Sequence, residues 1–145
     1  SYSVTGVQTC ALPISTVEEL ISNLALYLEE YQSCRLFSWS KYDTTVLRGY
    51  GFNTPIEDMI DSIKNIIDLP NYRLKDVCRF LGIASNEYLL DDGKFWGLII
   101  SHLLKNKAEC QYCREIIAQL KEYNLDDVRK MAQILKKLKN NNKKP

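Results

Sequence analysis

The segment Arg35-Leu-Phe-Ser-Trp-Ser-Lys-Tyr-Asp43 places a short apolar and aromatic run directly before an acid. Polar residues flank Cys34–Trp39, which predicts a buried β-strand there. A helix is expected from Asp43 to about Tyr50, because an acid favours its first turn and Gly49-Tyr-Gly51 stops it. A strand, an acid and a helix in this order hold a carboxylate at the rigid end of a strand.

A second segment, Leu69-Pro-Asn-Tyr-Arg-Leu-Lys-Asp-Val-Cys-Arg-Phe-Leu-Gly-Ile83, is followed within ten residues by Tyr88-Leu-Leu-Asp-Asp92. It predicts a helix from about Leu74 to Leu81 that Gly82 ends. A further amphipathic helix is expected over residues 91–104, where apolar residues recur at helical spacing. The acid Asp92 therefore stands directly before a packed helix.

In order and separation, the two segments resemble the second and third motifs of the DnaQ-like (DEDD) 3′–5′ exonuclease superfamily, over roughly Thr16 to Leu104. The resemblance implies the α/β class, as a partial RNase H-like exonuclease fold that lacks its first strands. Such a fragment would be mostly helical with two short strands. The resemblance also implies that Asp43 is the acid of the second motif, here in a Trp-x3-Asp form, and that Asp92 is the acid of the third.

The third motif departs from the usual pattern of that superfamily. Where one branch has a His five residues before the final Asp, this chain has Glu87. Where the other branch has a Tyr four residues before it, this chain has Tyr88. Either side chain could orient the attacking water, and either could equally mark a degenerate site. Both remain candidate catalytic residues beside Asp43 and Asp92.

The resemblance implies a metal-dependent reaction. Hard cations such as Mg²⁺ or Mn²⁺ prefer carboxylate oxygens, and Asp43 and Asp92 are the candidate ligands. Two such ions can activate a water and stabilise the leaving oxygen of a phosphodiester. The expected substrate is the 3′ end of DNA or RNA.

The first motif of the superfamily, Asp-x-Glu on an opening strand, has no counterpart in this chain. Residues 1–14 contain no acid, and residues 4–14 look like a translated sequencing adapter, so we expect an artefactual or disordered leader over residues 1–14. The expected organisation is that leader, a partial exonuclease domain over 15–105, a helical extension over 106–139 and a disordered basic tail over 140–145. Without the first motif we expect a fragment with little or no turnover.

Other elements follow from local pattern. Ser15-Thr-Val-Glu18 is a capping box before a helix that runs to about Tyr31. Residues 59–63 are compatible with a short second strand. A C-terminal hairpin of two helices is expected, about 108–123 and 125–138, with Asp126 and Asp127 at the start of the second.

Composition sets broad limits. Residues 1–104 carry 8 Lys and Arg against 13 Asp and Glu, and residues 105–145 carry 11 against 5. An acidic body with a basic end suits metal binding in one part and polyanion contact in the other. Five cysteines form no even disulfide framework, which favours a reducing, cytoplasmic setting. No apolar run approaches 18 residues, so no membrane partner is expected.

Several residues have simpler readings. Asp43 could only cap a helix, Asp61 could be a strand-end acid without a metal role, and Asp91 competes with Asp92. His102 is expected as a core or surface residue. Cys110-x2-Cys113 supplies two of the four ligands that a structural zinc site needs. Two alternative functions stay open: a non-catalytic nucleic-acid-binding module of the same fold, and an unrelated helical interaction domain without a strand at 34–39.

Overall fold

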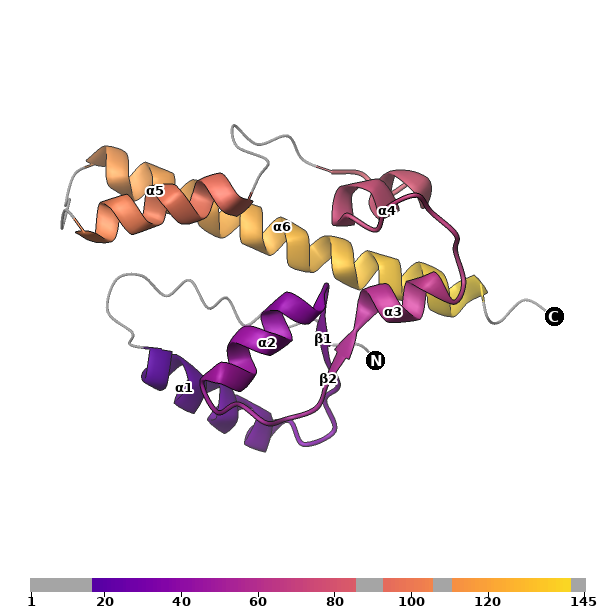
Figure 1. Cartoon of the computed structure of the whole chain (residues 1–145), viewed down its shortest axis with the longest axis horizontal. Coiled ribbons are helices and arrows are strands. Elements are labelled where there is room, and N and C mark those ends of the chain that lie inside the picture. Colours follow the sequence, from indigo (N-terminus) through magenta and orange to yellow (C-terminus); the bar gives the residue numbers. More distant parts are fainter. Residues whose placement is uncertain (1–16, 86–92, 106–110, 142–145) are drawn as a thin grey trace. The chain divides into compact units, whose positions relative to one another are not determined.

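The computed structural model describes residues 17–85, 93–105 and 111–141 (Figure 1). Helices dominate this part of the chain, and two short strands accompany them. The described residues form two units that meet in sequence inside α4 (Leu74–Phe80), between Val77 and Cys78. The expectation of a mostly helical chain with two short strands is confirmed.

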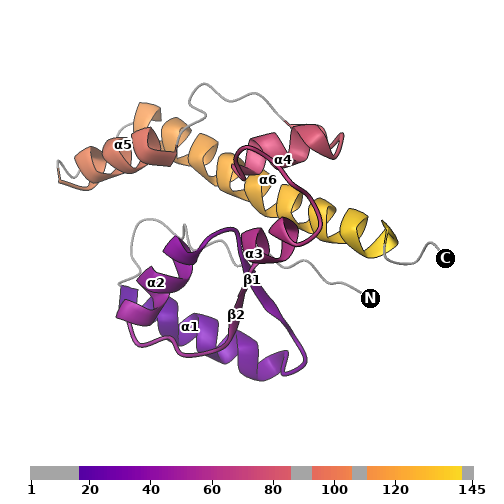
Figure 2. The same ribbon diagram turned by 45° about the vertical axis from the view of Figure 1, so that its right-hand side comes forward.

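The unit that ends at Val77 contains a pair of parallel strands. Three residue pairs join them, and their last pair is Ser38 opposite Asp58. Each strand leads directly into a helix (Figure 2). In chain order the elements are α1 (Val17–Glu30), β1 (Leu36–Ser38), α2 (Lys41–Gly49), β2 (Ile56–Asp58) and α3 (Met59–Lys64).

The strand expected over residues 59–63 is wrong, because these residues form α3. Asp58 is the N-cap of this helix, and its Oδ1 accepts from the backbone N–H of Ile60 at 2.8 Å and of Asp61 at 3.4 Å. Met59 and Ile63 lie four residues apart and are buried, as one face of a helix requires. The apolar residues had suggested a strand, but the cap and the 3.6-residue period select a helix.

Helix α2 starts and ends on specific local contacts. Ser40 is its N-cap, and its side chain accepts from the N–H of Tyr42. At the other end, Gly51 has a φ of 83°. The N–H groups of Gly51 and Phe52 donate to Arg48 and Leu47 carbonyls respectively, at 3.0 Å each. This is a Schellman motif, which needs a left-handed residue after the helix.

Gly51→Ala should lower the free energy of unfolding by roughly 1 kcal/mol, because a Cβ disfavours the left-handed conformation. Gly49 offers a matched control two residues away, since it ends the helix without a positive φ and a Cβ there meets no atom within 4 Å. Gly49→Ala should leave stability unchanged or raise it by up to about 0.5 kcal/mol. Chemical denaturation of both variants checks the pair, and equal effects would contradict the turn geometry.

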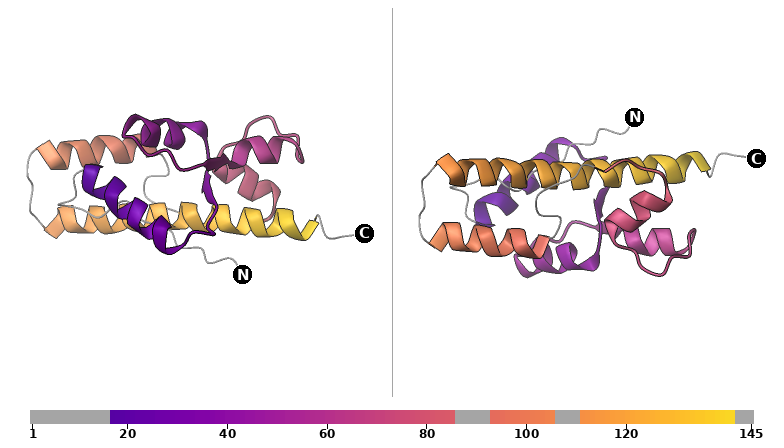
Figure 3. Two further views of the ribbon diagram at one scale, coloured as in Figure 1. Left: turned by 90° about the horizontal axis from the view of Figure 1, so that it is seen from below. Right: turned by 90° about the horizontal axis from the view of Figure 1, so that it is seen from above.

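The unit that begins at Cys78 is built on two long helices, α5 (Gly93–Lys105) and α6 (Gln111–Asn141). They lie side by side and antiparallel, with α5 beside the first half of α6 (Figure 3). Trp96 on α5 is 3% exposed, and its ring centroid lies 6.2 Å from that of Tyr123 on α6. Aromatic contact therefore contributes to the packing of this helix pair.

The expected hairpin of two helices after residue 108 is wrong. Residues 111–141 form one helix without a break near Asn124. No Gly or Pro occurs anywhere in this stretch, so nothing in it forces the chain to turn. Asp126 and Asp127 accordingly lie in the middle of α6 and not at a helix start. The antiparallel helix pair of the structure is formed by α5 and α6.

Helix α4 ends in a Schellman motif at Gly82. Gly82 has a φ of 66°, and the N–H of Ile83 donates to the Cys78 carbonyl at 2.9 Å. Cys78 and Ile83 are both buried, so the Schellman motif has its usual apolar contact. Lys137 of α6 donates from Nζ to the Leu81 carbonyl at 2.5 Å. The predicted helix end at Gly82 is confirmed, and a cation of α6 caps it.

A buried ion pair lies at the centre of α6. Lys130 Nζ is 3.0 Å from Asp126 Oδ2 and 3.7 Å from Asp127 Oδ1, and Lys130 is 4% exposed. Burial alone would lower the pKa of the Lys130 ammonium, but the contact with Asp126 and the charges of both aspartates raise it above 10.5. The stability that this contact contributes is therefore complete below pH 10.5 and is lost as the pH rises through the folded pKa.

Lys130→Met should lower the free energy of unfolding by about 3 kcal/mol, because it removes the cation that lies 3.0 Å from the buried Asp126 carboxyl. The double variant Lys130→Met, Asp126→Leu should recover most of that loss, since it removes both charges together. Asp127→Asn is the control, and because its side chain is one-third exposed we expect a loss below about 1 kcal/mol. A double variant no more stable than Lys130→Met would contradict the pairing.

Candidate functional site

The carboxyl ends of β1 and β2 meet at one edge of the sheet and gather polar side chains there. Ser38 is buried, and its hydroxyl donates to the Ser40 carbonyl at 3.0 Å and lies 3.2 Å from Thr44 Oγ1. Asp58, opposite Ser38 in the register, caps α3. In parallel sheets ligands bind outside the carboxyl ends of the strands, so this edge is the natural place for a site.

Asp43 lies in the first turn of α2, five residues after the end of β1. It does not cap the helix, because Ser40 does. Among the described residues, no hydrogen bond or ion pair joins its carboxylate to another group. The residue is exposed, yet partial burial raises the pKa of its carboxyl above the ordinary 3.8. Its carboxylate therefore has no protein partner among the described residues.

The other acids at this edge are engaged. Asp61, considered as a strand-end acid, lies in the first turn of α3, and its Oδ2 is 3.4 Å from Lys41 Nζ of α2. Asp58 Oδ1 accepts hydrogen bonds from two backbone N–H groups. Of these three acids, Asp43 is the one without a hydrogen bond or ion pair to another described residue.

The remaining predicted site residues, Asp92, Tyr88 and Glu87, lie outside the described residues, as does the competitor Asp91. The helix expected over residues 91–104 is present as α5, whose described residues are Gly93–Lys105. Over residues 17–85, 93–105 and 111–141, no group of three or more His, Cys, Asp and Glu side chains is placed to hold a metal ion. The structure therefore places one of the two proposed ligands.

The described residues contain no cluster of side chains that supports a zinc site. Cys34 is exposed, Cys78 is buried, and both are free thiols. Burial raises the pKa of the Cys78 thiol, an effect that nearby Lys130 opposes and Asp127 and Asp126 reinforce. His102 was expected either in the core or on the surface. It lies on α5 and is exposed, so it is a surface residue.

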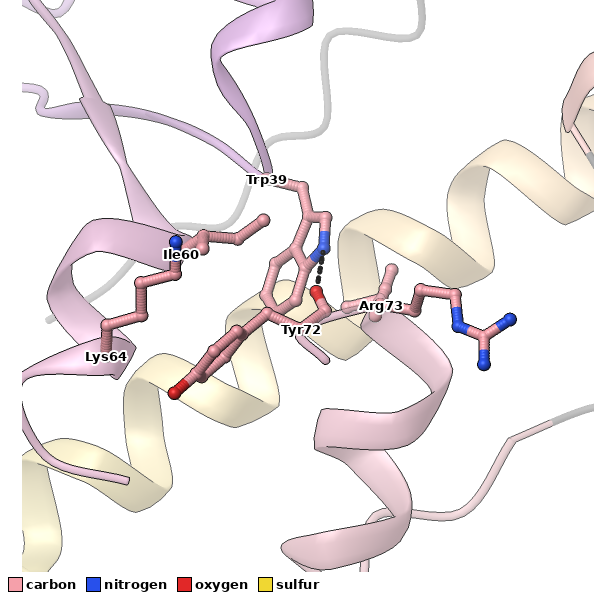
Figure 4. A pocket seen from close by; sticks show the side chains of 6 residues that line it. Trp39, Ile60, Lys64, Tyr72 and Arg73 are labelled. Atoms are coloured by element: carbon pink, nitrogen blue, oxygen red, sulfur yellow. Dashed lines mark hydrogen bonds between the residues drawn. The ribbon is translucent and has the colours of Figure 1, made fainter. Parts of the chain in front are cut away.

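A shallow pocket of about 530 Å³ lies in the same unit as Asp43 (Figure 4). The rings of Trp39 and Tyr72 lie close together at its centre, and the Trp39 Nε1–H donates to the Tyr72 carbonyl at 3.1 Å. Lys64 Nζ lies 5.4 Å from the centroid of the Tyr72 ring. The lining consists of Trp39, Ile60, Lys64, Tyr72, Arg73 and Leu74.

Sequence reasoning did not find this pocket. Trp39 and Tyr72 stand 33 positions apart, and each alone is compatible with a plain core residue. The one available signal was that each aromatic lies inside one of the two quoted segments.

Comparison of the chain with protein-family models, curated proteins and solved structures finds no match. In the part of the chain that the structure describes, no helix combines the length and apolar character needed to cross a bilayer.

Titration of the Asp43 carboxyl tests its environment. Without metal we expect its pKa in the folded chain to exceed that in the urea-unfolded chain, because burial disfavours the charged form. Saturating Mg²⁺ should lower the folded value, since a cation favours the carboxylate. Carbon-detected NMR of the Asp43 side chain measures both values. A role in cation binding would be contradicted if the Asp43 pKa were the same in the folded and unfolded chains and did not change on addition of Mg²⁺.

Proposed function

We propose that this chain is part of a two-metal 3′–5′ exonuclease of the DnaQ-like type, which hydrolyses terminal phosphodiesters of DNA or RNA. The observation that carries the proposal is the position of Asp43. It follows a strand of a parallel pair, lies in the first turn of the next helix and has no partner among the described residues. This is the arrangement that the Trp39-x3-Asp43 resemblance implies.

The alternative of an unrelated helical domain expected no strand at residues 34–39. A strand is present at Leu36–Ser38, and it pairs in parallel with β2. The strand–helix–strand–helix order of this unit supports the exonuclease proposal over that alternative.

In the proposed site Asp43 and Asp92 would hold Mg²⁺ or Mn²⁺ through carboxylate oxygens. Such ions, when bound, would supply Lewis-acid activation of water and neutralise charge on the leaving oxygen. Asp43 would contribute a carboxylate ligand, whose position β1 and α2 fix. Tyr88 or Glu87 orients the attacking water by hydrogen bonding. Since the chain contains no Asp-x-Glu motif, we expect metal binding from it and little turnover.

Metal binding tests the proposal directly. We expect Mn²⁺ to broaden the NMR signals of the first turn of α2 and of residues around 92 together. Asp43→Asn and Asp92→Asn should each weaken Mn²⁺ binding by about tenfold or more at both places, because each removes a ligand of one site.

Asp91→Asn is the matched control, since it removes an equal charge next to Asp92. It should leave Mn²⁺ broadening nearly unchanged. Broadening at one place only, or an equal loss in all three variants, would show that Asp43 and Asp92 do not share an ion. The exonuclease proposal would then be wrong.

A further inference from the structure

The pocket around Trp39 and Tyr72 is held in shape by hydrogen bonds on both rings. Beside the bond from Trp39 to the Tyr72 carbonyl, the Tyr72 hydroxyl donates to the Ile67 carbonyl at 2.9 Å. The same hydroxyl accepts from the Leu69 N–H at 3.2 Å. Both residues are only half-buried. The indole and the phenol are thus fixed before any ligand arrives, which reduces the entropy lost on binding.

Two cationic residues line the pocket, and they differ in availability. The ammonium of Lys64 is exposed, and the structure gives it no ion pair among the described residues, only the contact over the Tyr72 ring. The guanidinium of Arg73 points away from the rings on the other side (Figure 4). It pairs with Asp76 at 2.9 Å. Lys64 is therefore the cation that a bound anion would meet first.

We propose that this pocket binds one base of a single-stranded nucleic acid, with the adjoining phosphates on Lys64 and, more weakly, Arg73. Every base has a flat face that stacks on an aromatic ring, and such stacking tolerates any sequence. A phosphate follows each nucleoside, which matches cations on both sides of the rings. The inference rests on the proposed function for the class of polymer, but it uses neither Asp43 nor a metal ion.

The chain offers a clean reporter, because its two tryptophans are Trp39 and Trp96. Trp96 is 3% exposed, so Trp96→Phe keeps an aromatic core residue and leaves Trp39 as the sole indole. In this background, with EDTA present, oligo(dT) and oligo(U) octamers should each quench Trp39 emission in a saturable way. The two polymers separate a DNA ligand from an RNA ligand.

Lys64→Gln should weaken that binding and flatten the dependence of log K on log salt by about 0.7, the value for one phosphate contact on a single strand. Arg73→Gln should have a smaller effect, because Asp76 already neutralises part of its charge. Both residues are exposed, so neither variant threatens folding. Lys136→Gln is the matched control, since this exposed lysine of α6 lies outside the pocket and should change neither quantity.

Three outcomes would overturn the inference: no quenching of Trp39 by either polymer, Lys64→Gln binding like the parent, or an equal loss from Lys136→Gln. The last would assign binding to the basic end of the chain. Quenching of Trp39 in a parent chain that shows no Mn²⁺ binding at Asp43 and Asp92 would leave the pocket standing without the exonuclease. Mn²⁺ binding at both aspartates without quenching would leave the metal site and remove the pocket.

Discussion

The parallel pairing of β1 with β2 is the constraint on which the Asp43 unit depends. Two parallel strands cannot be joined by a tight turn, so the chain must cross over between them, and here α2 makes that crossing. Both strands then end at the same edge, and each feeds a helix there. Ser38, Asp43, Asp58 and Asp61 gather at that edge for this reason alone. Three residue pairs thus decide where the polar chemistry of the unit lies.

At that edge the acids divide by role according to their nearest backbone. Asp58 accepts from backbone N–H groups at the start of α3 and caps that helix. Asp61 of α3 forms an ion pair with Lys41 of α2. Asp43 has a cap three residues before it, so its charge is not needed to begin α2. Asp43 is thus exposed, without a structural role in starting α2 and without a partner among the described residues, which leaves its carboxylate available to a ligand. This division supports the metal-site proposal more than the presence of any one aspartate does.

Much of the local structure could be predicted from the sequence, and the misses have physical causes. The strand at Leu36–Ser38, the helix end at Gly82 and the helix start near Val17 follow from apolar runs, glycines and capping residues. The assignment at Met59 failed because a buried helix turn and a buried strand have the same composition over five residues. The break expected near Asn124 failed because Asp126 and Asp127 resembled a helix start, whereas they pair with Lys130 inside one helix. Both proposed metal ligands, Asp43 and Asp92, were predicted from the sequence, but only Asp43 lies among the described residues, so their shared site stays a prediction.

The uninterrupted course of α6 also limits how this protein can vary. Its buried lysine and aspartate share a stripe with Leu120, Ile134 and Leu138. Each residue advances a helix by about 100°, so inserting or deleting one residue upstream of this stripe would rotate it away from the core. Point replacements on the exposed side would leave the stripe in place. Divergent copies of this chain should therefore tolerate many exchanges along α6 but hardly any change in its length.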